Sequence, residues 1–346
     1  MIRSASWLLL LAAPLVHSAT LNVHIEGQQL RLENAIALGG NTYTLSDWTV
    51  ASGLTPTDRF LPGAYLTNKP DEMTLTGPTG ANVNAHIGLK GVQYNVSSNN
   101  YVRNDTQLVT PSCATSQLSG NTVTLADEST QSCSASFSLD YSNEVTPFYF
   151  YRPTFDLDKT ALLAALQGQE KGVYTATIPA DIRYYYQSSG GALTYRVLSD
   201  VFTVNIDYVP NSLESIDVAG DGVMNPTYDT TNHTVSAETM FNITATGTFS
   251  TGLSMTLLTH EFTLTSNTGK TEIPFSIECA STNCDDPIWV ENGANKLTND
   301  ETSYVLDAPT NVINFDLMVS YQDIPSTEVE SGTYSGSFTV MFEELY

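Results

Sequence analysis

Hydrophobic and polar residues alternate over many short stretches of this chain. The alternation is clearest at residues 202–208, 313–321 and 334–342, where every second position is apolar or glycine. Successive side chains of a β-strand point to opposite faces, so a period of two predicts strands with one buried face. The third stretch is predicted to be one continuous strand, with one face formed by Tyr334, Gly336, Phe338, Val340 and Phe342.

Short polar segments rich in glycine and asparagine separate the alternating stretches. They lie at residues 39–41, 188–191, 220–222 and 292–293. Glycine and asparagine accept the positive φ values that tight turns require, so these segments predict turns. Only residues 159–167, rich in alanine and leucine, predict a short helix. Many short strands joined by polar turns are typical of an all-β sandwich fold.

A domain boundary is expected near residues 208–212. Pro210 ends the preceding strand because proline cannot donate a hydrogen bond to a β-ladder, and a new strand pattern begins at Ile216. The chain is also long enough for two domains of ordinary size. The expected domains are residues 20–209 and residues 210–346.

The first 19 residues have the pattern of a secretion signal. Arg3 supplies a positive charge before an apolar run at residues 7–16. Ser18 and Ala19 are the small residues of a cleavage site. The apolar run is shorter than the roughly 20 residues that span a bilayer. The mature chain is therefore expected to be exported without membrane insertion.

The mature chain is acidic but sparsely charged. Once Arg3 is removed, 12 basic residues face 37 acidic ones, and charged residues make up only 14% of the sequence. This balance argues against nucleic acid and anionic membranes as partners, because both require clustered Lys and Arg. Residues 20–209 carry 10 basic and 17 acidic residues, whereas residues 210–346 carry 2 and 20. Positive charge is therefore concentrated in the first domain.

The four cysteines form two couples that are close in sequence. In an exported protein an even number of cysteines indicates disulfides. Four cysteines allow three pairings, of which the local ones, Cys113–Cys133 and Cys279–Cys284, are favoured. A zinc site is the competing interpretation, but the sequence has no paired histidines and no second CxxC motif. No metal and no cofactor are expected.

The sequence has no recognisable catalytic motif. A Gly-x-Ser-x-Gly elbow, an HExxH pair and a Walker loop are all absent from it. Carboxylate pairs are uninformative in so acidic a chain. The histidines of the mature chain are single and scattered, at His24, His86, His233 and His260. A binding protein is therefore favoured over an enzyme, with a secreted glycan-active enzyme as an alternative.

Two aromatic segments that contain arginine are candidate binding surfaces, residues 148–153 and 182–186. Aromatic faces stack on sugar rings, and a guanidinium offers a fork of donors to hydroxyls or carboxylates. Core packing is the competing interpretation for any one tyrosine. Arg183 is harder to place in a core, and in an acidic protein it would attract an anionic ligand such as a sialylated glycan.

Two segments resemble the minor tip adhesins of alternate chaperone–usher fimbriae, the class 5, colonisation-factor or CblD-like family. Residues 162–207 run from a Leu-rich helix through Gly172-Val173-Tyr174 and Arg183-Tyr184 to a final alternating strand. Residues 332–340 are similar to the last strand of that family's pilin domain. The resemblance implies two tandem immunoglobulin-like β-sandwiches, an N-terminal receptor-binding adhesin domain and a C-terminal pilin domain that is an incomplete sandwich.

The same resemblance implies functional residues in each domain. An arginine element of the receptor site falls on Arg183 and Tyr184, with Ile182 in place of the family's first arginine, and a second element falls on Arg59. The pilin domain would have a groove beside its last strand that accepts a donor strand from another subunit. The groove is expected along Tyr334, Phe338, Val340 and Phe342.

The implied partners are a periplasmic chaperone, an outer-membrane usher, the major pilin subunit as strand donor, and a host glycan or glycoprotein. The implied location is the tip of a fimbria at the cell surface, reached through the periplasm.

A polymerising structural subunit is an alternative to the tip adhesin, and it would need an N-terminal donor strand outside the first domain. Leu21, Val23 and Ile25 begin an alternation that breaks at Gly27. Residues 20–32 are therefore expected to lie within the first domain.

Overall fold

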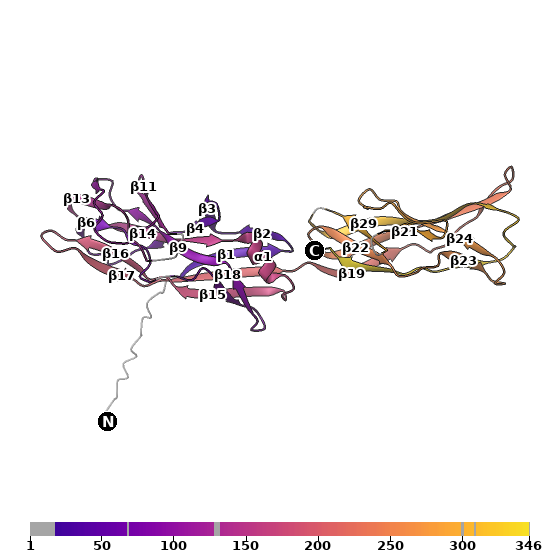
Figure 1. The fold of residues 1–346 in the computed structure, drawn as a ribbon, viewed down its shortest axis with the longest axis horizontal. Coiled ribbons are helices and arrows are strands. Elements are labelled where there is room, and N and C mark those ends of the chain that lie inside the picture. The colour runs from indigo at the N-terminus through magenta and orange to yellow at the C-terminus, as the bar shows by residue number, and fades with distance from the viewer. Residues whose placement is uncertain (1–17, 68, 128–131, 299–300, 308, 346) are drawn as a thin grey trace, which may run out of the picture. The chain divides into compact units, whose positions relative to one another are not determined.

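The computed structural model describes residues 18–67, 69–127, 132–298, 301–307 and 309–345 (Figure 1). Contacts divide the chain into two units. The N-terminal unit contains the residues up to Ile25 and Leu30–Tyr208, and the C-terminal unit contains Glu26–Gln29 and Val209–Tyr346. The expected secretion signal falls, except for its last two residues, outside the described part of the chain.

The N-terminal unit contains three sheets. The six-stranded sheet has the order β2 (Gln29–Leu32), β1 (Ser18–Glu26), β18 (Val201–Val209), β15 (Gly172–Pro179), β7 (Met73–Thr76), β8 (Asn82–Ala85). The five-stranded sheet has the order β10 (Tyr101–Asn104), β13 (Ser138–Val145), β6 (Thr57–Leu61), β16 (Ile182–Gln187), β17 (Thr194–Leu198). The seven-stranded sheet has the order β11 (Thr115–Ser119), β12 (Thr122–Ala126), β9 (Ile87–Val96), β14 (Phe148–Leu157), β4 (Thr42–Leu45), β3 (Ala35–Gly39), with β5 (Thr49–Val50) beside β14.

The long strands β9 and β14 join the two ends of the N-terminal core. Near one end of β14, the ring of Phe155 lies 5.4 Å from that of Phe202 in the six-stranded sheet. Near the other end, the ring of Phe148 lies 5.3 Å from that of Phe60 in the five-stranded sheet. The seven-stranded sheet therefore faces both of the other sheets, and one core cluster of buried side chains runs through all three.

The predicted helix is confirmed as α1 (Lys159–Leu166), the one helix among the described residues. Asp158 caps its first turn, because its Oδ1 accepts a hydrogen bond from the Ala161 N–H at 3.0 Å. Leu162 and Leu166, four positions apart on one helical face, are fully buried. No helix within the described ranges is long and apolar enough to cross a membrane.

The C-terminal unit also contains three sheets, one of seven strands and two of three. The seven-stranded sheet has the order β19 (Ser212–Ala219), β21 (Thr234–Phe249), β29 (Thr310–Pro325), β25 (Ser276–Cys279), β26 (Ile288–Glu291), β27 (Ala294–Asn295), with β20 (Thr227–Asp229) beside β21. One three-stranded sheet has the order β28 (Thr302–Leu306), β22 (Gly252–Leu257), β31 (Val340–Glu344). The other has the order β24 (Glu272–Pro274), β23 (Thr263–Ser266), β30 (Tyr334–Ser335).

The alternation at residues 313–321 does form a half-buried strand. In β29 the apolar positions 313, 315, 317, 319 and 321 are all buried. The ring of Phe315 lies 6.1 Å from that of Phe342 in β31, so the large sheet packs against a small one. The fold is thus all-β, as predicted, and its sheets are consistent with two β-sandwich domains.

Three of the four predicted turns are present. Residues 39–41 and 188–191 each form a turn between two strands. Residues 220–222 lie instead in a longer connection, residues 220–226, that contains no regular turn. Asn292 and Gly293, with φ of 47° and 78°, form the two-residue loop between β26 and β27. This is the conformation that an Asn-Gly pair supplies to a tight hairpin.

Two strand boundaries differ from the prediction. The strand expected to begin at Ile216 begins at Ser212. The continuous strand expected over residues 334–342 is wrong, because β30 pairs with β23 and β31 pairs with β22. The chain crosses from one small sheet to the other between them. Gly336 allows the close approach at this crossing, since a Cβ there would lie 2.6 Å from the Thr263 carbonyl oxygen.

Both disulfides favoured by the local cysteine spacing are present. Cys113 and Cys133 are bonded across a separation of 20 residues. Cys279 and Cys284 are bonded across a separation of 5 residues. Each bond closes a loop within one unit.

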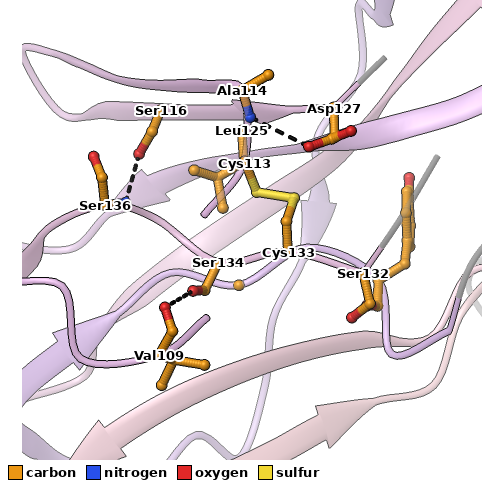
Figure 2. The surroundings of a disulfide bond; sticks show 12 residues. Val109, Cys113, Ala114, Ser116, Leu125, Asp127, Ser132, Cys133, Ser134 and Ser136 are labelled. Atoms are coloured by element: carbon orange, nitrogen blue, oxygen red, sulfur yellow. Dashed lines mark hydrogen bonds between the residues drawn. A yellow bond between two sulfur atoms is a disulfide. The ribbon is translucent and has the colours of Figure 1, made fainter. Parts of the chain in front are cut away.

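Figure 2 shows the loops that the Cys113–Cys133 bond joins. Beside it, the Ala114 N–H donates to Asp127 Oδ2 at 3.3 Å, which ties the start of β11 to the end of β12. Ser132 directly precedes Cys133, the other cysteine of the bond. The disulfide therefore positions residues that belong to two different surfaces of the N-terminal unit.

Candidate functional site

Arg183 lies on the outward face of the sheet edge formed by β16 and β17. Its guanidinium carbon lies 5.6 Å from the ring centroid of Tyr185 and 5.9 Å from that of Tyr195. Tyr185 and Tyr195 are direct partners across the two strands, with ring centroids 6.2 Å apart. A guanidinium over aromatic faces is held by attraction to the ring quadrupole, worth about 0.5–1 kcal/mol at an exposed position.

The guanidinium of Arg183 retains capacity for a ligand. Its Nη2 donates to Ser132 Oγ at 3.3 Å. Among the described residues this is its only side-chain hydrogen bond, and no carboxylate there forms an ion pair with it. A guanidinium has five N–H donors. Together with Tyr195, which is 58% exposed, it presents positive charge and an aromatic face to solvent.

Tyr184 is a core residue, and its predicted contact with a ligand is wrong. Its side chain is 0% exposed, and its ring lies 5.2 Å from that of Phe148 and 6.0 Å from that of Phe60. Burial raises the pKa of its hydroxyl to about 12. Alternation within β16 could have placed it correctly, because Ile182 and Tyr184 share the face opposite to Arg183.

Arg59 is committed to contacts within the sheet. Its Nε and Nη2 donate to the two carboxylate oxygens of Asp140 at 2.8 and 2.9 Å, and its Nη1 donates to Gln187 Oε1 at 3.1 Å. The hydrogen bond from Arg59 holds the pKa of Asp140 below its ordinary value. Arg59 therefore ties β13, β6 and β16 together.

The two predicted arginines share a face but do not form a cluster. Arg59 is directly opposite Gln187, which lies four residues after Arg183 on β16. At about 3.3 Å per strand residue, their backbones are roughly 13 Å apart along the sheet. The structure thus gives the two side chains separate partners, tyrosines for Arg183 and a carboxylate for Arg59.

The other aromatic segment, residues 148–153, offers aromatic surface without an available cation. A β-bulge in β14 between Phe148 and Phe150 leaves Tyr149 and Phe150 both facing solvent, 50% and 39% exposed. Arg152 donates to the Leu45 carbonyl oxygen at 2.7 Å, and its guanidinium lies 4.1 Å from the centre of the Trp48 ring. Its guanidinium therefore packs against the protein itself.

The C-terminal unit contains a groove of 610 Å³ beside its last strand. Its wall includes the predicted residues Phe338, Val340 and Phe342, none of which is fully buried. Its floor is apolar and comes mainly from the seven-stranded sheet, through Phe241, Ile243, Leu317 and Val319, with Phe275 between β24 and β25.

Two edge strands border this groove. In the sheets described, β19 pairs only with β21, and β31 pairs only with β22. Val218 of β19 and Val340 of β31 both line the groove. Each strand therefore has one side without a ladder partner, and an unpaired strand edge is a template for pairing with another chain.

Tyr334, the fourth predicted groove residue, lines an adjoining cavity of 500 Å³. The two cavities share Gly222, Met224, Leu264 and Gly336. The hydroxyl of Tyr334 accepts a hydrogen bond from the Glu330 N–H at 2.9 Å, which fixes the ring. The hollow beside the last strand thus continues past the crossing at Gly336.

The ionisable residues that the structure describes form no metal centre. In the described part of the chain, no group of three or more His, Cys, Asp or Glu side chains is arranged to hold a metal ion. His24, for example, lies 3.0 Å from the carboxylate of Asp207.

Comparison with known proteins gave structural matches only. No model of a protein family matches the chain, and a search of curated proteins found no significant match. Its structure is similar over nearly its full length to two subunits of chaperone–usher pili. One is in the CsuC–CsuE chaperone–tip adhesion subunit complex from archaic Csu pili of Acinetobacter baumannii, with 13% identity, 95% of this chain and 99% of that chain covered, and a TM-score of 0.26.

The other is CfaE, the adhesive subunit of CFA/I fimbria of enterotoxigenic Escherichia coli. It is 10% identical, with 94% of this chain and 92% of that chain covered, and a TM-score of 0.28. Identities and TM-scores this low assign no role to individual residues of the chain.

Proposed function

We propose that this protein is a fimbrial tip adhesin. In this proposal the N-terminal domain, residues 20–209, binds a host or surface glycan. The C-terminal domain, residues 210–346, is an incomplete pilin-type sandwich that joins the pilus by accepting a donor strand. The protein passes through the periplasm and is displayed at the cell surface.

The observation that carries the proposal is the apolar groove between the edge strands β19 and β31. A sandwich normally covers such side chains with its own strands, but Phe338, Val340 and Phe342 remain partly exposed. An extended segment in the groove would hydrogen-bond to an open strand edge and insert every second side chain among the phenylalanines. This supports a C-terminal domain completed by another chain.

The proposed assembly partners are those that the family resemblance implies. A donor strand from the major pilin subunit is the occupant in the fibre. A periplasmic chaperone covers the groove before assembly, because an exposed apolar groove bordered by open strand edges is an aggregation hazard. An outer-membrane usher then exchanges one strand for the other.

The proposed glycan site consists of Arg183, Tyr185 and Tyr195. The buried Tyr184, which the sequence predicted to contact the ligand, is not part of it. The rings provide a stacking surface, and the guanidinium provides donors for a carboxylate such as that of a sialylated glycan. Within the described chain the guanidinium of Arg183 has one hydroxyl partner and no carboxylate partner, so most of its donors remain available to a ligand.

The alternative of a polymerising structural subunit is disfavoured by β1. This strand lies between β2 and β18 in the six-stranded sheet. Its residues Leu21, Val23 and Ile25 are buried in the core of the N-terminal unit. Residues 18–26 are therefore part of that fold and are not available as a donor strand for another subunit.

A pair of synthetic peptides tests the groove. The first has ten residues in which valine and threonine alternate, followed by two additional lysines at the end. The second has the same composition, but its valines are consecutive. We expect the alternating peptide, in excess over the full mature chain, to raise the melting temperature of the C-terminal unit by about 5 °C or more. The scrambled peptide should raise it far less. Equal shifts, or no shift with either peptide, would contradict the proposal.

A further inference from the structure

A polar cavity of 310 Å³ lies on the seven-stranded sheet of the N-terminal unit and shares no lining residue with the Arg183 cluster. It is lined by residues of β3, β4, β9, β11, β12 and β14 and by Asp127. Its size is at the lower end of the range for ligand pockets, about 300–1,000 Å³, so it fits one small ligand.

One wall of this pocket is a fixed carboxylate. Asp156 accepts a hydrogen bond from the hydroxyl of Thr42, its direct partner on β4, at 2.6 Å. Its other oxygen lies 3.8 Å from the ammonium of Lys90, a side chain that is only 10% exposed. Lys90 also donates to Asp71 at 2.8 Å. Asp156 is therefore held in one orientation, and a carboxylate that accepts these contacts still has lone pairs for a ligand.

The opposite wall presents hydroxyl and amide groups. Gln93 is buried and donates to the Thr124 hydroxyl oxygen at 2.9 Å, which leaves the Thr124 O–H to act as a donor. Gln117 lies directly opposite Thr124, and Thr115 lies two residues before Gln117 on the same face. Neither the Thr115 nor the Gln117 side chain forms a hydrogen bond with another residue of the described chain.

The charges around the pocket select the class of ligand. The positive charge of Lys90 is balanced by Asp71 and Asp156, and Asp127 adds a further carboxylate to the lining. This excess of negative charge disfavours an anionic ligand. Leu38, on the rim, supplies an apolar surface for C–H groups.

We infer that this pocket is a second binding site and that it holds one neutral sugar unit. Sugar hydroxyls both donate and accept, which matches a carboxylate, an amide and two threonine hydroxyls placed around one small cavity. Asp156 accepts from the sugar, Gln117 and Thr115 bond its other hydroxyls, and Leu38 packs against its apolar side. The disulfide Cys113–Cys133 holds the start of β11 beside Asp127 and so supports this wall (Figure 2).

The test uses the full mature chain and the methyl glycosides of galactose, mannose and N-acetylglucosamine, with binding followed by titration NMR. We expect at least one neutral glycoside to bind. Thr115→Val and Gln117→Ala should each weaken that binding about fivefold, the effect of losing one hydrogen bond. Ser119→Ala, also on exposed β11 surface but outside the pocket, is the control and should leave the affinity unchanged.

The melting temperatures of these variants distinguish a lost contact from a lost fold, and Thr115→Val changes the shape of the side chain least. If no neutral glycoside binds, or if Ser119→Ala weakens binding as much as Thr115→Val does, the inference is overturned. It does not depend on the proposed tip location or on Arg183. The binding of 3′-sialyllactose and its loss in Arg183→Ala test the other site, so the two can fail separately.

Discussion

Arg59 and Arg183 have the same charge and lie on the same face of the five-stranded sheet, but their neighbours differ. Arg59 gives its donors to Asp140 and Gln187, so its removal would leave a carboxylate without its partner. Arg183 lies over two tyrosine rings and donates to a single hydroxyl. The same residue type therefore serves the stability of the sheet at one position and offers a binding group at the other.

This difference predicts that one alanine substitution mainly lowers stability and the other mainly weakens binding. Arg59→Ala should lower the free energy of unfolding of the N-terminal unit by roughly 1–2 kcal/mol, because charge-assisted hydrogen bonds at a partly exposed site are lost. Arg183→Ala should change it by less than about 0.5 kcal/mol but weaken binding of 3′-sialyllactose about tenfold or more. Urea unfolding and titration NMR measure the two quantities. A reversed order of the two stability effects would contradict the assignments.

At the scale of strands and loops, the two disulfides allow a direct comparison. They close loops of different length, with separations of 20 residues for Cys113–Cys133 and 5 residues for Cys279–Cys284. In the chain-entropy model, removing them as paired alanine variants should cost about 3 and about 2 kcal/mol respectively. Urea unfolding of each unit measures the loss. A larger loss for the shorter loop would show that native contacts, and not loop entropy, dominate.

The elements that the sequence predicts well are those with a local cause. Alternation places β18 and β29, the Asn292-Gly293 pair forms its hairpin, and α1 lies where alanine and leucine cluster. The strand expected over residues 334–342 fails because alternation reports which way side chains face and does not report which strand accepts the hydrogen bonds. The chain changes from one sheet to the other at Gly336, while the alternating apolar side chains keep pointing to the same side.

The candidate site was only partly visible in the sequence for a similar reason. Arg183 is a candidate because basic residues are sparse in this chain, and the alternation around Ile182 could have shown that Tyr184 faces the core. Tyr195 could not be assigned, because its place beside Arg183 depends on the register of β17 against β16. The polar pocket around Asp156 is formed by six strands, and no local pattern brings them together.

At the scale of the whole molecule, the two units share an architecture but differ in charge and in completeness. Each contains three sheets, of seven, six and five strands in the N-terminal unit and of seven, three and three strands in the C-terminal unit. The N-terminal unit carries most of the basic residues and the polar surfaces. The C-terminal domain, residues 210–346, with 2 basic and 20 acidic residues, has the apolar groove that its own strands leave open. This contrast supports a division between binding in one unit and attachment in the other.

Amide hydrogen exchange of the full mature chain, with and without the alternating valine–threonine peptide, tests the acceptance of a donor strand most directly. The account predicts new protection in β19 or β31, or both, because an inserted strand pairs with their open edges. The scrambled peptide should produce none. Protection that appears only at other strand edges, such as β17 or β8, or no protection with the alternating peptide, would contradict a strand-accepting groove in the C-terminal unit.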